Sequence, residues 1–276
     1  MKKWFAVMGD PIEHSKSPAM HNAWFREKSI DATYIPVHVS SESLESAVAG
    51  LKTLGASGWN VTIPHKTAII PYLDELDELA EKNGCCKYGC SNKGRYIKRY
   101  NTDGVGFVRS LEEAVGKSHK DKPVLLIGAG GAARGIAFAM QQQGYENLTI
   151  ANRTVANAQA IVDEMGTGQA ISLTEAEATL ADFGILVQMT SAGLATGNFS
   201  MPFSLDRLTK GAIVADIVYN PLMTPFLQAA EEKGATIVTG LGMFVHQGAI
   251  AFEYWLGESP NTNSMIAQLK AQLGGY

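Results

Sequence analysis

The chain has few of the features that mark membrane, secreted or nucleic-acid-binding proteins. Its three cysteines, Cys85, Cys86 and Cys90, are too few and too clustered for a disulfide framework. No apolar run approaches the ~20 residues that a membrane-spanning helix needs, and the run after Lys2 and Lys3 is too short for a signal peptide. A net charge of −4 provides no basic surface for nucleic acid or an anionic membrane. We therefore expect a cytoplasmic protein without membrane or nucleic-acid partners.

The remaining composition is that of an ordinary globular protein. Of the 276 residues, 46% are hydrophobic and 18% charged, which allows one large domain or two medium ones. The cysteines have no fourth ligand nearby in a known zinc spacing, so we expect no metal site. Internal repeats and low-complexity linkers are absent from the sequence.

Strand and helix patterns alternate along the chain, which predicts an α/β fold. We expect strands at 4–8, 33–39, 58–63, 124–127, 147–151, 185–188, 213–217 and 236–238. We expect helices from Pro18, with Ser17 as the N-cap, at 43–54, from Lys66, with an acidic face at 74–81, and at 105–115, 156–165, 225–233 and 244–256. Residues 84–94 interrupt this rhythm and are expected to form a loop.

Two glycines mark the expected domain limits, Gly104 and Gly242. Residues 1–104 with 243–276 are predicted to form an α/β substrate domain, and 105–242 an inserted Rossmann-type nucleotide domain. The C-terminal helices then return to the first domain. A small substrate is expected to meet a nicotinamide in a cleft of the kind that domain interfaces form.

A glycine-rich turn follows the apolar run at 124–127. Residues 128–135 read Gly-Ala-Gly-Gly-Ala-Ala-Arg-Gly and fit G-x-G-x-x-A, with Gly128 in the turn and Gly130 where a pyrophosphate approaches the backbone. A lone match of this kind is weak evidence, and a turn without a ligand is the alternative. The next apolar run ends in Asn152-Arg153-Thr154. An arginine where NAD sites carry an acid suits a 2′-phosphate and predicts NADP, although a surface arginine is the plain alternative.

Polar residues before the nucleotide domain are candidates for substrate chemistry. Ser15 and Ser17 precede a helix N-terminus, where hydroxyls and free N–H groups suit a carboxylate. Lys66 follows a strand and can donate a proton to a developing alkoxide, and Asp103 can pair with it and hold it charged. The plain alternatives are an N-cap, a solvated lysine and a turn aspartate. Gln247 is an amide on an apolar helix that could bond a substrate hydroxyl or belong to the core, and Met243 could pack on the nicotinamide.

Together these residues resemble the shikimate dehydrogenase family of the aromatic amino acid (chorismate) pathway. The most specific match is Asn-Val-Thr-Ile-Pro-His-Lys at 60–66, beside Gly-Asp-Pro-Ile-Glu-His-Ser-Lys-Ser-Pro-Ala-Met-His-Asn at 9–22. In the family's order, the remaining matches are 101–104, 128–135, 152–154, 216–221 and 240–243, ending at Gln247.

The resemblance implies an NADP-dependent oxidoreductase that reduces 3-dehydroshikimate to shikimate, as a monomer or homodimer. It implies that the substrate is bound by Ser15, Ser17, Thr62, Lys66, Asp103, Tyr219 and Gln247, of which Lys66 and Asp103 form the catalytic pair. It implies that NADP is bound by Gly128, Gly130, Gly131, Ala132, Asn152, Arg153, Thr154, Thr190, Ile217, Gly240 and Met243.

One segment departs from the family pattern. Where the family has Gly-Ala-Val-Asn-Thr-Val, whose asparagine binds substrate, residues 84–89 read Gly-Cys-Cys-Lys-Tyr-Gly. The codons GGG TGC TGT AAA TAC GGT, followed by the T of Cys90, encode the residues seen here. Read one base later, they give GGT GCT GTA AAT ACG GTT, which encodes the family's six residues. We hypothesise a local frame slip, either a sequencing error or a real pair of indels, which resequencing tests.

If the protein carries Lys87 and Tyr88, the substrate asparagine is missing. We then expect a raised KM or little activity, with NADP binding retained. This leaves a catalytically impaired NADP-binding paralogue as one alternative. A quinate/shikimate dehydrogenase is the other, although an NAD-using quinate enzyme would more often show an acid where Arg153 stands.

Overall fold

The chain folds into two compact units. The computed structural model describes residues 2–72, 75–76, 88–92, 96–190 and 201–274. The first unit consists of Met1–Thr102 with Gln247–Met265, and the second of Asp103–His246 with Ile266–Tyr276. The expected two-domain α/β fold is confirmed, whereas the domain limits at 104 and 242 stay a prediction. Among the described residues, no helix is both long and apolar enough to cross a membrane.

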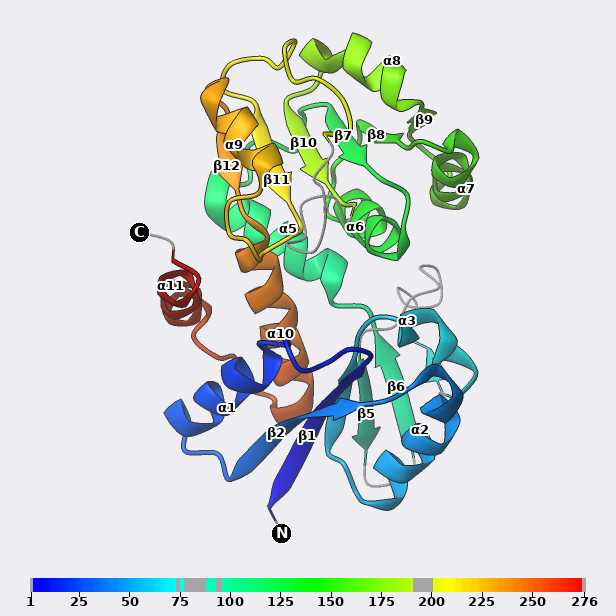
Figure 1. Cartoon of the computed structure of the whole chain (residues 1–276), viewed down its shortest axis with the longest axis vertical. Helices are drawn as coiled ribbons and strands as arrows, with labels where there is room; N and C mark the ends of the chain where they lie inside the picture. The colour runs from blue at the N-terminus through cyan, green and yellow to red at the C-terminus, as the bar shows by residue number, and fades with distance from the viewer. Residues whose placement is uncertain (1, 73–74, 77–87, 93–95, 191–200, 275–276) are drawn as a thin grey trace. The chain divides into compact units, whose positions relative to one another are not determined.

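A mixed sheet forms the centre of the first unit (Figure 1). Its strands are β1 (Lys3–Gly9), β2 (Ala32–His38), β3 (Gly58–Val61), β4 (Glu75–Leu76), β5 (Tyr88–Asn92) and β6 (Tyr96–Tyr100). They lie in the order β2-β1-β3-β5-β6-β4. Strand β1 is parallel to β2 and β3, whereas β5 is antiparallel to β3 and β6. Because β1 and β3 are parallel, the loops that follow them leave from the same edge of the sheet.

Helices cover the apolar residues of this sheet. They are α1 (Ser17–Glu27), α2 (Leu44–Thr53) and α3 (His65–Ala68), with 3-10 turns at Ser41–Ser43 and Ile70–Tyr72, and the C-terminal part of α10 (Gly240–Leu256). Leu44, Val48 and Leu51 of α2 pack in one cluster with Trp59 and Val61 of β3. Alternate strand residues face the other way, and there the rings of Phe5, Phe25 and Trp255 meet.

Tyr34 of the edge strand β2 contacts two residues of α1. The Asn22 side chain donates from Nδ2 to the Tyr34 carbonyl oxygen at 2.8 Å and accepts from the Tyr34 N–H at 2.9 Å. The neighbouring His21 ring stacks on the Tyr34 ring, with centroids 4.4 Å apart and planes within 4°. Two consecutive helix residues thus hold one residue of β2 through its backbone and its side chain.

The structure corrects three expectations for the first unit. Residues 88–92 of the expected loop form β5, because they pair with β3 and β6, while 84–87 lie outside the described residues. Glu75–Leu76 of the expected acidic helical face pairs with β6 as a strand. Ser17 is the first residue of α1 rather than its cap: Lys16 occupies the N-cap position and makes no capping bond.

A parallel sheet forms the centre of the second unit (Figure 1). Its strands are β7 (Val124–Ile127), β8 (Leu148–Ala151), β9 (Gln169–Ile171), β10 (Ile185–Gln188), β11 (Ile213–Asp216) and β12 (Thr236–Val238). The helices are α5 (Asp103–Val115), α6 (Gly131–Gln142), α7 (Val155–Met165), α8 (Leu173–Ala178), α9 (Pro225–Glu232) and part of α10, a 3-10 turn at Leu180–Asp182, and the larger part of α11 (Thr262–Gln272).

The strand order of this second sheet, β12-β11-β10-β7-β8-β9, is the doubly wound order. Strands β7, β8, β10 and β11 are buried along their whole length, which explains why they are mostly apolar. The connections reverse direction between β7 and β10. In such sheets ligands bind at the carboxyl ends of the strands beside this reversal.

Candidate functional site

The glycine-rich turn lies at the reversal point of the second sheet. Gly128 follows β7 with φ +109°, a conformation that favours glycine. Gly130 is the N-cap of α6, is exposed, and would meet no neighbour within 4 Å if it carried a Cβ. Gly131 and Ala132 open the helix. Exposed N–H groups at the start of a helix, with free space in front of them, fit a pyrophosphate.

Thr190, predicted to bind the cofactor, lies beside this turn. It follows β10, and a Cβ on Gly128 would come within 2.8 Å of the Thr190 methyl carbon. The Gln188 amide holds Thr190 by donating to its hydroxyl at 2.8 Å and accepting from its N–H at 2.9 Å. The structure therefore brings residues from both sides of the reversal into contact.

The segment after β8, residues 152–154, is polar and mostly exposed. The Asn152 amide donates to the Thr154 carbonyl oxygen at 2.9 Å and so shapes the turn into α7. Arg153 and Thr154 are exposed at the carboxyl end of the sheet. A guanidinium available to solvent at this place fits the 2′-phosphate of NADP.

The remaining predicted cofactor residues surround the start of α10. A Cβ on Gly240 would lie 2.5 Å from the Ile217 carbonyl oxygen, so only glycine permits this approach. Met243 is 8% exposed and belongs to the apolar core of the second unit. Tyr219, predicted to contact substrate, stacks on Phe244 with ring centroids 4.4 Å apart.

In the first unit, the predicted substrate residues lie on loops that leave one edge of the sheet. Ser15 and Ser17 follow β1, and the Ser15 hydroxyl accepts from the Ser17 N–H at 3.3 Å. Thr62 follows β3, and its N–H donates to the Met8 carbonyl oxygen of β1 at 2.9 Å. The structure thus groups three hydroxyls on neighbouring loops, where a small polar ligand can bind.

Lys66 lies on α3, four residues after Thr62. The preceding residue, His65, is buried, and its Nε2 lies 2.6 Å from the Val39 carbonyl oxygen. Because Val39 in turn donates to the Gly9 carbonyl oxygen at 3.1 Å, the carboxyl ends of β1 and β2 are both connected to α3. Lys66 is half-buried on this anchored turn.

Gln247 and Asp103 lie on helices. Gln247 is 1% exposed, and its neighbour Gly248 lies against Met20 of α1: a Cβ at Gly248 would come within 2.2 Å of the Met20 methyl carbon. Asp103 is the first residue of α5 and is 3% exposed. Lys66 belongs to the first unit and Asp103 to the second, and their pairing stays a prediction.

A buried carboxylate was present in the matched segments but received no role from the sequence. Asp216 ends β11, is 1% exposed, and accepts from the Val218 N–H at 2.9 Å and the Thr224 hydroxyl at 2.8 Å. Burial raises the pKa of Asp216 to about 6, against the two hydrogen bonds, which lower it. A carboxylate at the end of an apolar strand, followed by Thr-Pro at a helix start, was the signal for it.

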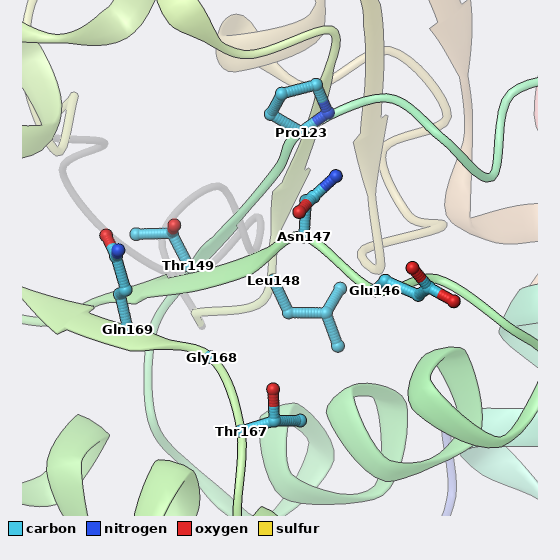
Figure 2. A pocket seen from close by; sticks show the side chains of 8 residues that line it. All are labelled: Pro123, Glu146, Asn147, Leu148, Thr149, Thr167, Gly168 and Gln169. Atoms are coloured by element: carbon cyan, nitrogen blue, oxygen red, sulfur yellow. The ribbon is translucent and has the colours of Figure 1, made fainter.

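A pocket of about 360 Å³ in the second unit lies away from all these residues (Figure 2). Its walls come from the residue before β7, the start of β8 and the chain leading into β9, including Pro123, Asn147 and Gly168. These are the amino ends of the strands, whereas the glycine-rich turn is at their carboxyl ends. The pocket is therefore not the predicted cofactor site.

Comparison with known proteins identifies relatives along the whole chain. Three family models match: shikimate dehydrogenase substrate binding domain at residues 7–87, shikimate/quinate 5-dehydrogenase at 110–217, and shikimate 5′-dehydrogenase C-terminal domain at 240–270. A curated shikimate dehydrogenase (NADP(+)) of Lysinibacillus sphaericus is 83% identical over 275 residues, covering 100% of both chains.

Solved structures agree with these matches. A shikimate dehydrogenase in complex with NADP+ superposes with a TM-score of 0.91 at 36% identity, covering 99% of this chain and 96% of its own. Shikimate 5-dehydrogenase of Thermus thermophilus, in complex with NADP(H) and shikimate, gives a TM-score of 0.87 at 32% identity over 96% of this chain and 97% of its own.

Proposed function

The chain belongs to the shikimate dehydrogenase family, and we propose that it reduces 3-dehydroshikimate to shikimate with NADPH. The observation that carries this proposal is the 83% identity to an NADP(+)-dependent relative along the whole chain. The grouping of Ser15, Ser17, Thr62 and Lys66 on adjoining loops of the first unit supports it.

NADP is the cofactor, and the residues of the second unit fit it. The open N-terminus of α6 at Gly130 suits the pyrophosphate, and exposed Arg153 suits the 2′-phosphate. Thr190, Ile217 and Met243 are proposed to line the nicotinamide end. When bound, NADPH supplies the hydride that reduces the C3 carbonyl carbon.

The substrate groups have distinct proposed partners. The hydroxyls of Ser15, Ser17 and Tyr219 bind the carboxylate. Burial raises the pKa of Tyr219, so its phenol stays protonated at neutral pH and can donate a hydrogen bond. The amide of Gln247 and the hydroxyl of Thr62 bind ring hydroxyls.

The proton transfer is assigned to Lys66. Its Nζ donates a proton to the oxygen at C3 as the carbonyl becomes an alcohol. The Asp103 carboxylate is proposed to orient this ammonium and to favour its charged form until the proton moves. In the reverse direction Lys66, as a free amine, accepts the proton from the C3 hydroxyl.

The alternatives are not favoured by the relatives. An impaired paralogue would rest on residues 84–90 alone, and Arg153 argues against an NAD-using quinate enzyme. We propose a cytoplasmic location, since a water-soluble substrate and NADPH must both reach the site, and a monomeric or homodimeric state.

Turnover of shikimate with NADP+ tests the proposal. We expect Lys66→Ala to lower kcat about 10²–10⁴-fold, because the general acid–base group is removed, with an unchanged dissociation constant for NADP+. Lys3→Ala, at an exposed lysine of β1, is the matched control and should retain full activity. A wild-type protein without turnover would refute the proposed function, and an active Lys66→Ala would remove Lys66 from the mechanism.

A further inference from the structure

The connection between β11 and α9, residues 217–224, is closed at its base by buried polar groups. Asp216 accepts from Val218 and from Thr224, which stand at the two ends of the connection. Thr224 is fully buried, and its hydroxyl also accepts from the Leu227 N–H at 3.3 Å, as the N-cap of α9. One hydroxyl therefore links the end of a central strand to the start of a helix.

Two further contacts fix the connection along its length. At Gly240 the start of α10 approaches the carbonyl oxygens of Ile217 and Val218, to which a Cβ there would lie only 2.5 and 2.6 Å away. At the next residue, the Tyr219 ring stacks on Phe244 with an interplanar angle of 23°. Tyr219 is therefore held through the backbone that precedes it and through its ring.

A buried carboxylate is a costly way to close a loop. Removing a charge from water is unfavourable, and the raised pKa of Asp216 reflects that cost. Apolar residues would close the loop without it, but they lack the directional acceptors that fix both ends of the connection. This cost is reasonable where the orientation of the connection matters to function.

We propose that Asp216, Thr224 and Phe244 are positioning residues that hold the Tyr219 phenol in one orientation for the substrate carboxylate. The inference rests on the proposed function, which supplies the role of Tyr219. None of the three touches the reacting atoms: Asp216 and Thr224 act through the backbone of the connection, and Phe244 acts through the Tyr219 ring.

Thr224→Val provides the central test, since valine keeps the shape of threonine and removes its hydroxyl. We expect the KM for shikimate to rise about five- to thirtyfold, the effect of one buried hydrogen bond. The dissociation constant for NADP+ should change less than the KM does. Thr224→Ser retains the hydroxyl and should restore a KM close to that of the wild type.

A double-mutant cycle separates positioning from general stability. Tyr219→Phe removes the hydroxyl that Thr224 is proposed to orient, so adding Thr224→Val to it should raise the KM no further. If the two effects multiply, or if Thr224→Val alone has the wild-type KM, the inference is overturned. Absence of turnover in the wild type would instead refute the proposed function.

Phe244→Leu provides the same test if Thr224→Val does not fold. It removes the stacked ring at a half-buried position and leaves the base of the connection intact. We expect a rise of about threefold in the KM for shikimate, as for the loss of one aromatic pair, and no rise in the Tyr219→Phe background. A wild-type KM in Phe244→Leu overturns the inference.

Discussion

Each unit has a buried titratable group next to elements that position its proposed ligand residues, His21 in the first and Asp216 in the second, and these two groups respond to protons in opposite ways. In the first unit, His21 lies among Trp24, Tyr34 and Trp255 and is 0% exposed. In the second, Asp216 is 1% exposed and bonded to Thr224. Burial penalises the charged form in both cases, lowering the pKa of the base and raising that of the acid.

This contrast shows that similar burial has consequences set by the sign of the charge. Acid charges His21 and neutralises Asp216. By itself, His21 should therefore make the first unit less stable in acid, and Asp216 by itself should make the second more stable. The chain has four tryptophans, and all of them, Trp4, Trp24, Trp59 and Trp255, belong to the first unit. Their fluorescence reports that unit separately.

The largest effect should come from His21. Burial lowers its pKa to about 3 from 6.5, so the unfolded chain binds the extra proton between these values. The contribution of His21 to the free energy of unfolding is complete above pH 6.5. Below that pH it falls by about 1.4 kcal/mol per pH unit, so the loss reaches roughly 5 kcal/mol near pH 3. We expect His21→Phe to flatten this dependence in denaturant titrations followed by tryptophan fluorescence.

The exposed His14 provides a matched control for this measurement. His14→Gln should keep the wild-type slope between pH 6.5 and 3. An unchanged slope in His21→Phe would show that other groups cause the acid sensitivity, and the contrast between the two units would fail.

Asp216 should give the next effect, with the opposite sign. Its folded pKa of about 6 exceeds the value of 3.8 for a free carboxyl, so the folded chain holds the extra proton. Its contribution is present below pH 3.8 and is lost as the pH rises through 6, which costs about 3 kcal/mol. Asp216→Asn should abolish this slope in hydrogen exchange of β11, whereas Asp182→Asn, at an exposed position, should keep it. A slope that survives in Asp216→Asn contradicts the assignment.

Arg153 should give the smallest effect, because its charge is exposed and screened. We expect Arg153→Ala to raise the KM for NADP+ about tenfold or more, the effect of lost charged hydrogen bonds, and to leave the KM for NAD+ unchanged. The difference in the KM for NADP+ between Arg153→Ala and the wild type should shrink as salt is added. Lys210→Ala, at an exposed lysine of the same unit, serves as the control. Equal changes for both cofactors would remove Arg153 from the 2′-phosphate site.

The second sheet could be predicted from the sequence because its central strands are buried on both faces. Such strands are mostly apolar, and the predicted strand at 185–188 matches β10 residue for residue. Strand β9 went unpredicted because Gln169–Ile171 is a short edge strand with no buried residue. Helix α8 also went unpredicted, although Ser172 and Glu175 form a capping box that the sequence displays.

The first sheet was harder to predict because distant pairings decide it. Tyr88–Asn92 has the composition of a loop and becomes a strand through partners in β3 and β6. The site residues at 15, 17, 62 and 66 could be named from local motifs, and parallel pairing explains why their loops adjoin. The hydrogen bond between Thr224 and Asp216 could be found only in the structure, since eight positions separate the two residues in the sequence.

The Asn22 amide also affects how copies of this chain can associate. Strand β2 ends its sheet, and the exposed edge of a sheet is a place where another chain can add a strand. At Tyr34 both backbone groups are already bonded to Asn22, so an incoming strand would have to displace that side chain. Removing the amide would therefore free two backbone groups at this edge for pairing with an added strand.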